Sequence, residues 1–180
     1  MWQLTHRSAT SLKRSSLSDE ASSGPERTAR RRLAFARGEG AEQAETANLS
    51  ALLEDVVANA RRSGARIDLT APPNMMLKLR VDAVRRALTN LLDNARRHAR
   101  GVAVSVEELP RAVQIVVDDD GPGIPEDRRE SVFRPFESDA AGGTGLGLTI
   151  ARDIVRGHGG DILLETSPMG GLRARVRLPL

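Results

Sequence analysis

The apolar positions of this 180-residue chain become periodic only after residues 1–46, a segment rich in Ser, Arg, Gly and Glu. Two later stretches, residues 52–62 and 82–99, repeat apolar side chains at the spacing of one helix face. Ser50 is placed to cap the first of these helices, and Gly64 is placed to end it. A third helix is expected directly after a later glycine-rich stretch.

Shorter segments alternate apolar and polar side chains at the period of a β-strand. They are residues 66–70, 77–80, 102–108, 112–119, 161–166 and 172–180. Leu109-Pro110 and Met169-Gly170-Gly171 supply turns that make hairpins of the neighbouring strands. Helices and strands in this order predict an α/β fold, a two-layer α/β sandwich in which one mixed, mostly antiparallel sheet carries its helices on one face.

Composition excludes several classes of protein. The chain has no cysteine, which excludes a disulfide scaffold and a thiolate metal site. Its apolar runs, such as residues 115–117, are far too short to cross a membrane, and its start lacks the apolar core of a signal peptide, so we expect a cytoplasmic protein without a membrane segment. The net charge is +3, but the arginines are spread along the chain and only 2% of the residues are aromatic, so nucleic acid is not expected as a partner.

The helix expected over residues 82–99 carries two asparagines, Asn90 and Asn94, on the face opposite its apolar residues. Asparagine is unfavourable inside a helix, so a pair one turn apart calls for a reason beyond solvation. An amide oxygen can ligate Mg²⁺, and Arg97 and His98 on the same face can contact phosphate oxygens. The alternative is a polar face that only meets water.

Two glycine-containing segments follow this helix. Asp119 ends an apolar strand, and Gly121 and Gly123 turn the chain where a flat ligand can approach the backbone, while the carboxylate can accept a hydrogen bond from an exocyclic amine. Residues 142–148, with the sequence GGTGLGL, pass directly into a helix and present N–H groups to which phosphates bind. Taken singly, the first segment is also compatible with a plain turn and the second with a flexible hinge.

In this order, the segments resemble the ATP-binding catalytic domain of two-component sensor histidine kinases, within the wider GHKL superfamily of gyrase, Hsp90 and MutL ATPases. NLLDNARRHA is similar to the N box of that family, DDDGPGIP to its first glycine box, FRPF to its F box and GGTGLGLTIAR to its second glycine box. The resemblance covers residues 47–180, which we expect to form this domain. Residues 125–142 would be its mobile lid, in which residues 137–141 lack the basic residue that the family often carries.

The resemblance also implies a role for each site residue and the cofactors ATP and Mg²⁺. Asn94 would hold the metal ion with support from Asn90. Arg97 and His98 would reach the phosphates, and Asp119 would bind the adenine amine. The adenine pocket would be shaped by Gly121, Gly123 and Ile124. The backbone N–H groups that face the phosphates would come from Gly143, Thr144, Gly145, Leu146, Gly147 and Leu148.

Residues 1–46 are expected to be a short helical or disordered segment, a degenerate or truncated form of the dimerisation and phosphoacceptor hairpin that precedes the ATP domain in this family. The family's phosphoacceptor box reads His-Glu-x-Arg-Thr-Pro-Leu, and residues 6–12 keep its histidine, threonine and leucine but lack its acid, arginine and proline. The resemblance makes His6 a candidate phosphoacceptor. Residues 31–40 are similar to the end of the second hairpin helix, and the hairpin is the candidate contact of a homodimer.

The function that this resemblance implies is that of a protein histidine kinase, which transfers the γ-phosphoryl group of ATP to a histidine for relay to the aspartate of a response-regulator receiver domain. Two alternatives stay open. A free-standing serine kinase of the anti-sigma-factor type has the same ATP site without the histidine hairpin, and a non-catalytic regulator would only bind nucleotide. FRPF and GGTGLGL favour the sensor-kinase branch, whereas the lid without a basic residue and Arg7 in the place of the family's acid favour a regulator. Related full-length kinases are often membrane-anchored.

Overall fold

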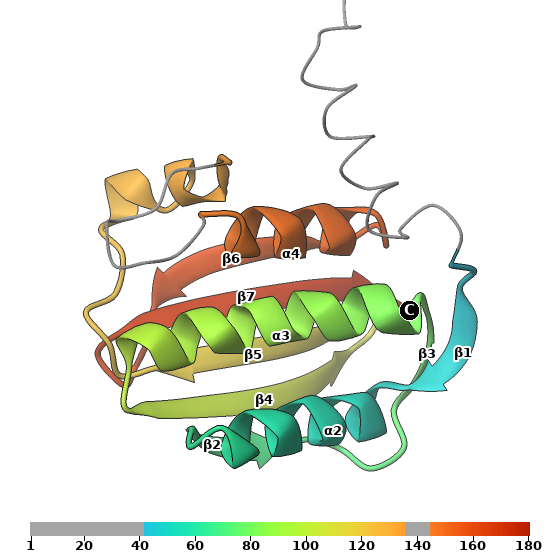
Figure 1. Ribbon diagram of the computed structural model, residues 1–180. Helices are drawn as coiled ribbons and strands as arrows, with labels where there is room; N and C mark the ends of the chain where they lie inside the picture. The colour runs from blue at the N-terminus through green and yellow to red at the C-terminus, as the bar shows by residue number, and fades with distance from the viewer. Residues whose placement is uncertain (1–41, 136–144) are drawn as a thin grey trace, which may run out of the picture. The chain divides into compact units, whose positions relative to one another are not determined.

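A five-stranded mixed sheet forms one layer of the domain in the computed structural model, which describes residues 42–135 and 145–180 (Figure 1). From one edge to the other, its strands are β2 (Arg66–Thr70), β4 (Gly101–Leu109), β5 (Ala112–Asp119), β7 (Leu172–Pro179) and β6 (Asp161–Thr166). β2 pairs with β4 in parallel, and the other neighbours pair antiparallel. The hairpins β4–β5 and β6–β7 are those that the alternating patterns predict.

Three helices form the second layer, on one face of the sheet, with α3 between α2 and α4 (Figure 1). They are α2 (Leu49–Arg62), α3 (Val81–His98) and α4 (Gly147–Arg156), and the connection from β5 to α4 contains two short 3₁₀ helices, η1 (Glu126–Arg128) and η2 (Ser131–Phe133). The helices pack on inward-facing residues of the sheet such as Val104, Ile115 and Val176. The predicted two-layer sandwich is therefore confirmed. Within the described ranges, every helix is too short or too polar to cross a membrane.

A second, two-stranded sheet joins β1 (Glu45–Asn48) to β3 (Met76–Leu79) in antiparallel pairing. The sequence pattern does not predict β1, because its four residues, ETAN, show no alternation of apolar and polar side chains. Its partner β3 is expected, and β3 contributes the buried side chains of Leu77 and Leu79 to the core. The two-stranded sheet therefore depends on β1, a strand that the pattern of apolar residues does not predict.

The prediction that Ser50 caps α2 is wrong. Asn48 is the N-cap residue, and its side-chain oxygen accepts a hydrogen bond from the N–H of Ala51 at 3.2 Å. Ser50 is buried in the first turn, where its hydroxyl donates to the carbonyl of Pro72 at 2.6 Å and accepts from the N–H of Met75 at 3.3 Å. Asparagine and serine are both good caps, so the choice between them was made by a contact with a loop distant in sequence.

The first turn of α3 is held by two side chains from distant parts of the chain. Its N-cap, Arg80, makes no side-chain capping bond. Instead, the carboxylate of Glu42 accepts hydrogen bonds from the N–H groups of Asp82 and Ala83 at 2.7 and 3.1 Å. The N–H of Arg80 donates to Nε2 of His158 at 3.1 Å. The negative charge of Glu42 also interacts favourably with the positive N-terminal end of the helix dipole. These contacts define the first turn of the helix that carries the two asparagines.

We predict that Asn48→Ala lowers the free energy of unfolding by about 1 kcal/mol, because it removes the acceptor at the start of α2. Asn48→Ser keeps an acceptor at that position and should retain most of the stability. Denaturant titrations followed by circular dichroism measure the difference. An Asn48→Ala variant as stable as the wild type would contradict the assignment of this residue as the cap.

Candidate functional site

The two asparagines of α3, Asn90 and Asn94, are both half-buried. Asn90 faces the start of α4, since its Cβ lies 3.9 Å from the position that a Cβ on Gly147 would occupy. Its side-chain nitrogen Nδ2 is buried and has no hydrogen-bond partner among the residues that the structure describes. Because a buried amide without a partner is costly, this atom marks a position for a ligand or a water molecule. Arg97 and His98 are exposed at the end of the same helix.

β5 ends with two carboxylates that face opposite sides of the sheet. Asp118 lies on the side away from the helices, where Nε and Nη2 of Arg173 donate to it at 2.8 Å each. Asp119 lies on the helix side and is only 5% exposed, and its Oδ1 accepts hydrogen bonds from the N–H groups of Gly121 at 2.9 Å and Leu172 at 3.0 Å. Within the described ranges both of its hydrogen bonds go to Oδ1, so Oδ2 is left to accept one from a ligand.

The turn after β5 packs against the end of α3 and against the turn between β6 and β7. A Cβ on Gly121 would lie 2.8 Å from the carbonyl oxygen of His98, so this close approach requires glycine. Gly123 has a φ of +71°, and a Cβ there would lie 3.2 Å from the carbonyl oxygen of Gly171. Ile124 is half-buried and packs against the core. The first glycine box and the asparagine helix are thereby brought together.

The start of α4 offers backbone donors beside Asn90. Residues 145–148 are half-buried, and Gly145 has a φ of +65°. The N-cap, Leu146, makes no side-chain capping hydrogen bond. The first N–H groups of a helix have no acceptor within the helix, and together with the positive end of the helix dipole they attract anions. This end of α4 can therefore bind phosphate oxygens.

Some predicted site residues lie outside the part of the chain that the structure describes. They are His6, Gly143 and Thr144, together with residues 136–142 of the predicted lid. The geometry of the site rests on the N box, the first glycine box and residues 145–148.

The sequence patterns did not single out the third aspartate of DDDGPG. Oδ1 of Asp120 accepts hydrogen bonds from the N–H groups of Arg100 at 2.8 Å and Gly101 at 2.9 Å, which ties the end of β5 to the connection between α3 and β4. The bond from Gly101 and then that from Arg100 lower the pKa of the Asp120 carboxyl below its ordinary value. The only signal in the sequence for this role is the run of three carboxylates beside a glycine turn. The sequence does not show which of the three accepts backbone hydrogen bonds and which is free to bind a ligand.

Arg152, on α4, was also missed, and it is a buried cation. Its Nε donates to Asp161 at 2.8 Å and its Nη1 to Glu130 at 2.7 Å, and its guanidinium carbon lies 4.1 Å from the centroid of the Phe133 ring. Burial raises the pKa of the Asp161 carboxyl, but hydrogen bonds from Arg152 and Arg156 outweigh it and hold this pKa well below the ordinary value. The signal in the sequence that could have indicated its burial is the place of Arg152 among the apolar positions of the helix pattern.

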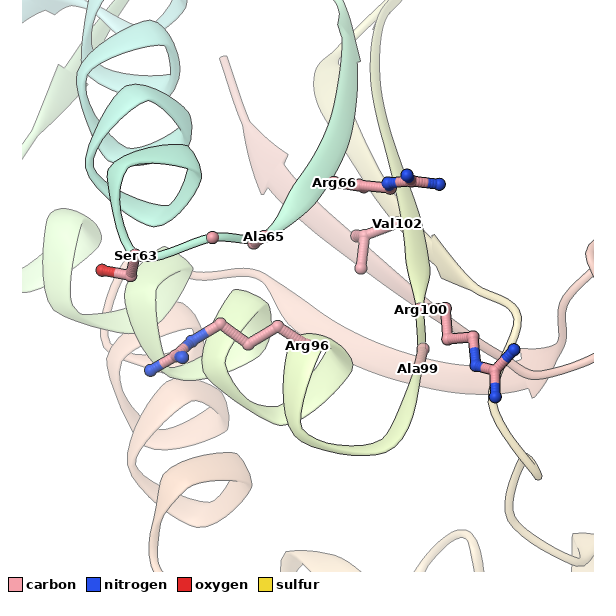
Figure 2. Close-up of a pocket in the computed structure, with 8 residues that line it drawn as sticks. Ser63, Ala65, Arg66, Arg96, Ala99, Arg100 and Val102 are labelled. Atoms are coloured by element: carbon pink, nitrogen blue, oxygen red, sulfur yellow. The ribbon is translucent and has the colours of Figure 1, made fainter.

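A cavity of about 380 Å³ lies at the C-terminal ends of α2 and α3 (Figure 2). Three arginines line it, but Figure 2 shows Arg96 extending to one side and Arg66 and Arg100 to the other, so their guanidinium groups do not converge. Nε of Arg96 already donates to Asp93 at 2.7 Å. The lining residues are Ser63, Gly64, Ala65, Arg66, Arg96, Ala99, Arg100 and Val102, which include none of the predicted nucleotide-binding residues.

Three helices over a mixed sheet, with a buried carboxylate at a strand end and a glycine-rich helix start beside paired asparagines, are the arrangement of an ATP-binding α/β sandwich. The family described as histidine kinase-, DNA gyrase B- and HSP90-like ATPase matches residues 79–180. The chain belongs to this family, as the order of its four motifs predicts. The expected membership of the ATPase superfamily that includes histidine kinases is thus confirmed.

Individual relatives and solved structures agree with this membership. Sensor histidine kinase GtrS of Pseudomonas aeruginosa is 48% identical over 99 residues, which are 54% of this chain and 21% of that protein. A probable sensor histidine kinase HK of Mycobacterium tuberculosis is 34% identical in an alignment of 192 positions, which covers 97% of this chain and 51% of that protein. The ATP-binding domain of PrrB from Mycobacterium tuberculosis has a similar structure, with a TM-score of 0.67 and 30% identity over 77% of this chain and 98% of the solved one. This chain therefore spans no more than about half of either full-length relative and nearly all of the isolated domain.

We predict that Gly171→Ala weakens ATP binding by about tenfold or more, because it displaces the carboxylate of Asp119 and so removes the hydrogen bond that this carboxylate would accept from the nucleotide. A hydrogen bond to a charged group contributes about 1.5–3 kcal/mol. A Cβ on Gly171 would collide with Oδ1 of Asp119 and lie 2.5 Å from the backbone nitrogen of Gly121. Gly170→Ala is the control, since Gly170 has a φ of +99° but open space around it, so its variant strains the turn without touching the carboxylate. Calorimetric titrations with ATP compare the two variants, and an equal loss in both would assign the effect to the turn alone.

We predict that the contribution of Asp161 to stability disappears in acid. Because its pKa in the folded chain lies below the ordinary value of 3.8, the stabilisation is fully present above that pH and declines as the pH falls toward the pKa of the folded chain. The difference in unfolding free energy between the wild type and Asp161→Asn should be constant near neutral pH and shrink below about pH 4. Denaturant titrations across this range test it, with Asp153→Asn on α4 as the control for the loss of one exposed charge. A difference that grows in acid would contradict the prediction.

Proposed function

We propose that this chain binds ATP together with Mg²⁺ and transfers the γ-phosphoryl group to a histidine, from which the aspartate of a response-regulator receiver domain accepts it. The observation that carries the proposal is the meeting of three motifs along α3. Asn90 lies beside Gly147 at the start of α4, and the carbonyl of His98 lies against Gly121. Phosphoryl transfer depends on positioning and on charge stabilisation, and this arrangement supplies amide oxygens, backbone donors and cationic side chains in one region.

Asp119 is the proposed adenine-binding residue. With Oδ1 occupied by two backbone N–H groups, Oδ2 is the oxygen that accepts a hydrogen bond from the exocyclic amine of adenine. Guanine carries a carbonyl oxygen at the corresponding position, which a carboxylate would repel, so the same contact selects ATP over GTP. Gly121, Gly123 and Ile124 form the proposed walls of the adenine pocket, where two glycines let the base approach the backbone.

The N box is the proposed phosphate and metal site. Mg²⁺ prefers oxygen ligands and is commonly held by one or two protein groups together with phosphate oxygens. The amide oxygen of Asn94, supported by that of Asn90, fits that need. Nδ2 of Asn90, which has no partner among the described residues, is a donor for a phosphate oxygen or a water molecule. The metal ion would neutralise phosphate charge, and the exposed side chains of Arg97 and His98 would contact the phosphates through charge-assisted hydrogen bonds. The remaining phosphate donors are the N–H groups of Gly143, Thr144, Gly145, Leu146, Gly147 and Leu148.

His6 is the proposed phosphoacceptor within this chain, which has three histidines. In His158, Nδ1 forms a hydrogen bond with the carbonyl of Ile154 at 2.7 Å and Nε2 accepts one from Arg80, so both ring nitrogens are engaged in the fold. His98 belongs to the proposed phosphate site. An attacking imidazole must be neutral and in line with the phosphorus, which requires a ring nitrogen that is free.

The proposal treats residues 1–46 as the shortened dimerisation and phosphoacceptor segment and residues 47–180 as the catalytic domain. Support comes from the relative that matches 97% of this chain, because a match of that extent includes most of residues 1–46. Through this segment two copies of the chain would form a homodimer. We place the protein in the cytoplasm, where both ATP and receiver domains are found. The sensor-kinase relatives favour a histidine over a serine acceptor.

We predict that the wild type incubated with γ-labelled ATP and Mg²⁺ gains an acid-labile label, which His6→Ala abolishes without lowering the affinity for ATP. Acid lability distinguishes phosphohistidine from phosphoserine. Label that survives in His6→Ala would exclude His6 as the sole acceptor. ATP binding without any label would favour the nucleotide-binding regulator over the kinase.

The same preparation tests the metal assignment. Asn94→Ala should weaken ATP binding about tenfold with Mg²⁺ present and have little effect with EDTA, because it removes only a ligand of the metal ion. Asn59→Ala, which changes an exposed asparagine of α2, serves as the control. Equal losses with and without Mg²⁺ would assign Asn94 to the nucleotide instead. If the wild type does not bind ATP, the proposed function is wrong.

A further inference from the structure

Arg152 joins the middle of α4 to η2 through contacts that none of the proposed nucleotide roles uses. The residue is only 7% exposed, although burying a guanidinium is unfavourable unless it is well paired. Its partners are Asp161 at the start of β6, Glu130 just before η2, and the ring of Phe133, over which the guanidinium lies at 4.1 Å. A cation over an aromatic face is attracted to it, and more strongly when both are shielded from water.

A second residue on the same face of α4 also contacts Phe133. Thr149, one turn before Arg152, donates its hydroxyl to the carbonyl oxygen of Phe133 at 2.8 Å. Residues three apart share a helix face, so Thr149 holds the backbone of Phe133 while Arg152 covers its ring. Both Thr149 and Phe133 are buried. η2 therefore cannot leave α4 without breaking both contacts.

The segment that ends at Phe133 begins at the proposed adenine pocket. Nε of Arg129 donates to the carbonyl of Ile124 at 3.0 Å, and Nη2 of the same arginine donates to the hydroxyl of Thr166 at 2.8 Å. At its other side, α4 starts with Gly147 beside Asn90. Residues 124–133 thus connect the adenine side of the site to the helix whose first turn faces the phosphates.

We propose that Arg152 is a positioning residue for the nucleotide, which holds residues 124–133 against α4 and so fixes the adenine side of the site relative to the phosphate side. The proposal rests on the ATP-binding role proposed above. It assigns a function to a residue that would not touch ATP.

The two carboxylates bound to Arg152 separate this role from plain stabilisation. Asp161 is shared with Arg156, whose Nη2 lies 3.0 Å from it, so this side of the network keeps a partner when one arginine is changed. The side chain of Glu130 is 78% exposed, and ion pairs with exposed groups add little to stability. Removing the charge of Glu130 should therefore leave the fold intact and only loosen the held segment.

The test compares ATP affinity, measured calorimetrically with Mg²⁺, among Arg152→Lys, Glu130→Gln, the double variant and Arg156→Gln. Arg152→Lys keeps the charge but loses the planar fork, and it should weaken binding about tenfold, with Glu130→Gln weakening it roughly threefold. The double variant should bind no more weakly than Arg152→Lys alone, because both changes break one contact. Arg156→Gln, which removes the other arginine on Asp161, should stay within about twofold of the wild type.

Hydrogen exchange of the amides in residues 126–135 gives a second readout in the absence of nucleotide. Exchange should accelerate in Arg152→Lys and Glu130→Gln but not in Arg156→Gln. Thermal melts identify which variants are folded at the temperature of the assay. If Arg152→Lys does not fold, Glu130→Gln alone decides the matter. Wild-type affinity in the folded Arg152 and Glu130 variants, or an equal loss in Arg156→Gln, overturns the proposal. A wild type that binds no ATP overturns the proposed function itself, whereas a loss confined to these variants leaves that function standing.

Discussion

The buried carboxylate of Asp119 imposes the constraint on which the rest of the site depends. A charged oxygen that is almost removed from water must be hydrogen-bonded, and here its donors are backbone N–H groups at Gly121 and Leu172. These donors can reach Oδ1 only if the turn after β5 and the start of β7 come very close to the carboxylate. Glycine at positions 121 and 171 is the consequence, because a side chain at either place would occupy the space of the carboxylate or of the neighbouring backbone.

α3 depends on the same close packing at its far end. The carbonyl of its last residue, His98, lies against the turn at Gly121, and its first turn is held by Glu42 and His158. Contacts at both ends restrain the rotation and sliding of this helix, and so they help to set the direction of Asn90 and Asn94 relative to the start of α4. The two asparagines are therefore positioned by loops at the helix ends as much as by the apolar face that packs on the sheet.

Much of the fold, and the motifs that meet in the candidate site, could be predicted because their signals lie in contiguous residues. Helix and strand periods predicted the helices and strands other than β1, and the spacing of Asn90 and Asn94 marked the polar face of α3. The remaining features are contacts between residues far apart in sequence. Ser50 and Asn48 are equally suited to cap α2, and only the loop at residues 72–75 distinguishes them. The burial of Arg152 likewise depends on partners that come from two other elements, which no local pattern reveals.

The adjacent aspartates at the end of β5 have different surroundings, because successive side chains of a strand face opposite sides of the sheet. Asp118 forms an ion pair with Arg173 on the sheet face away from the helices, whereas Asp119 is enclosed on the helix side. A one-residue shift of β5 relative to β4 and β7 would exchange the two carboxylates and turn the free oxygen away from the site. Insertions or deletions within residues 112–119 would therefore remove the proposed adenine contact even where every motif residue is retained. The pairing register of the central strand is itself a component of the candidate site.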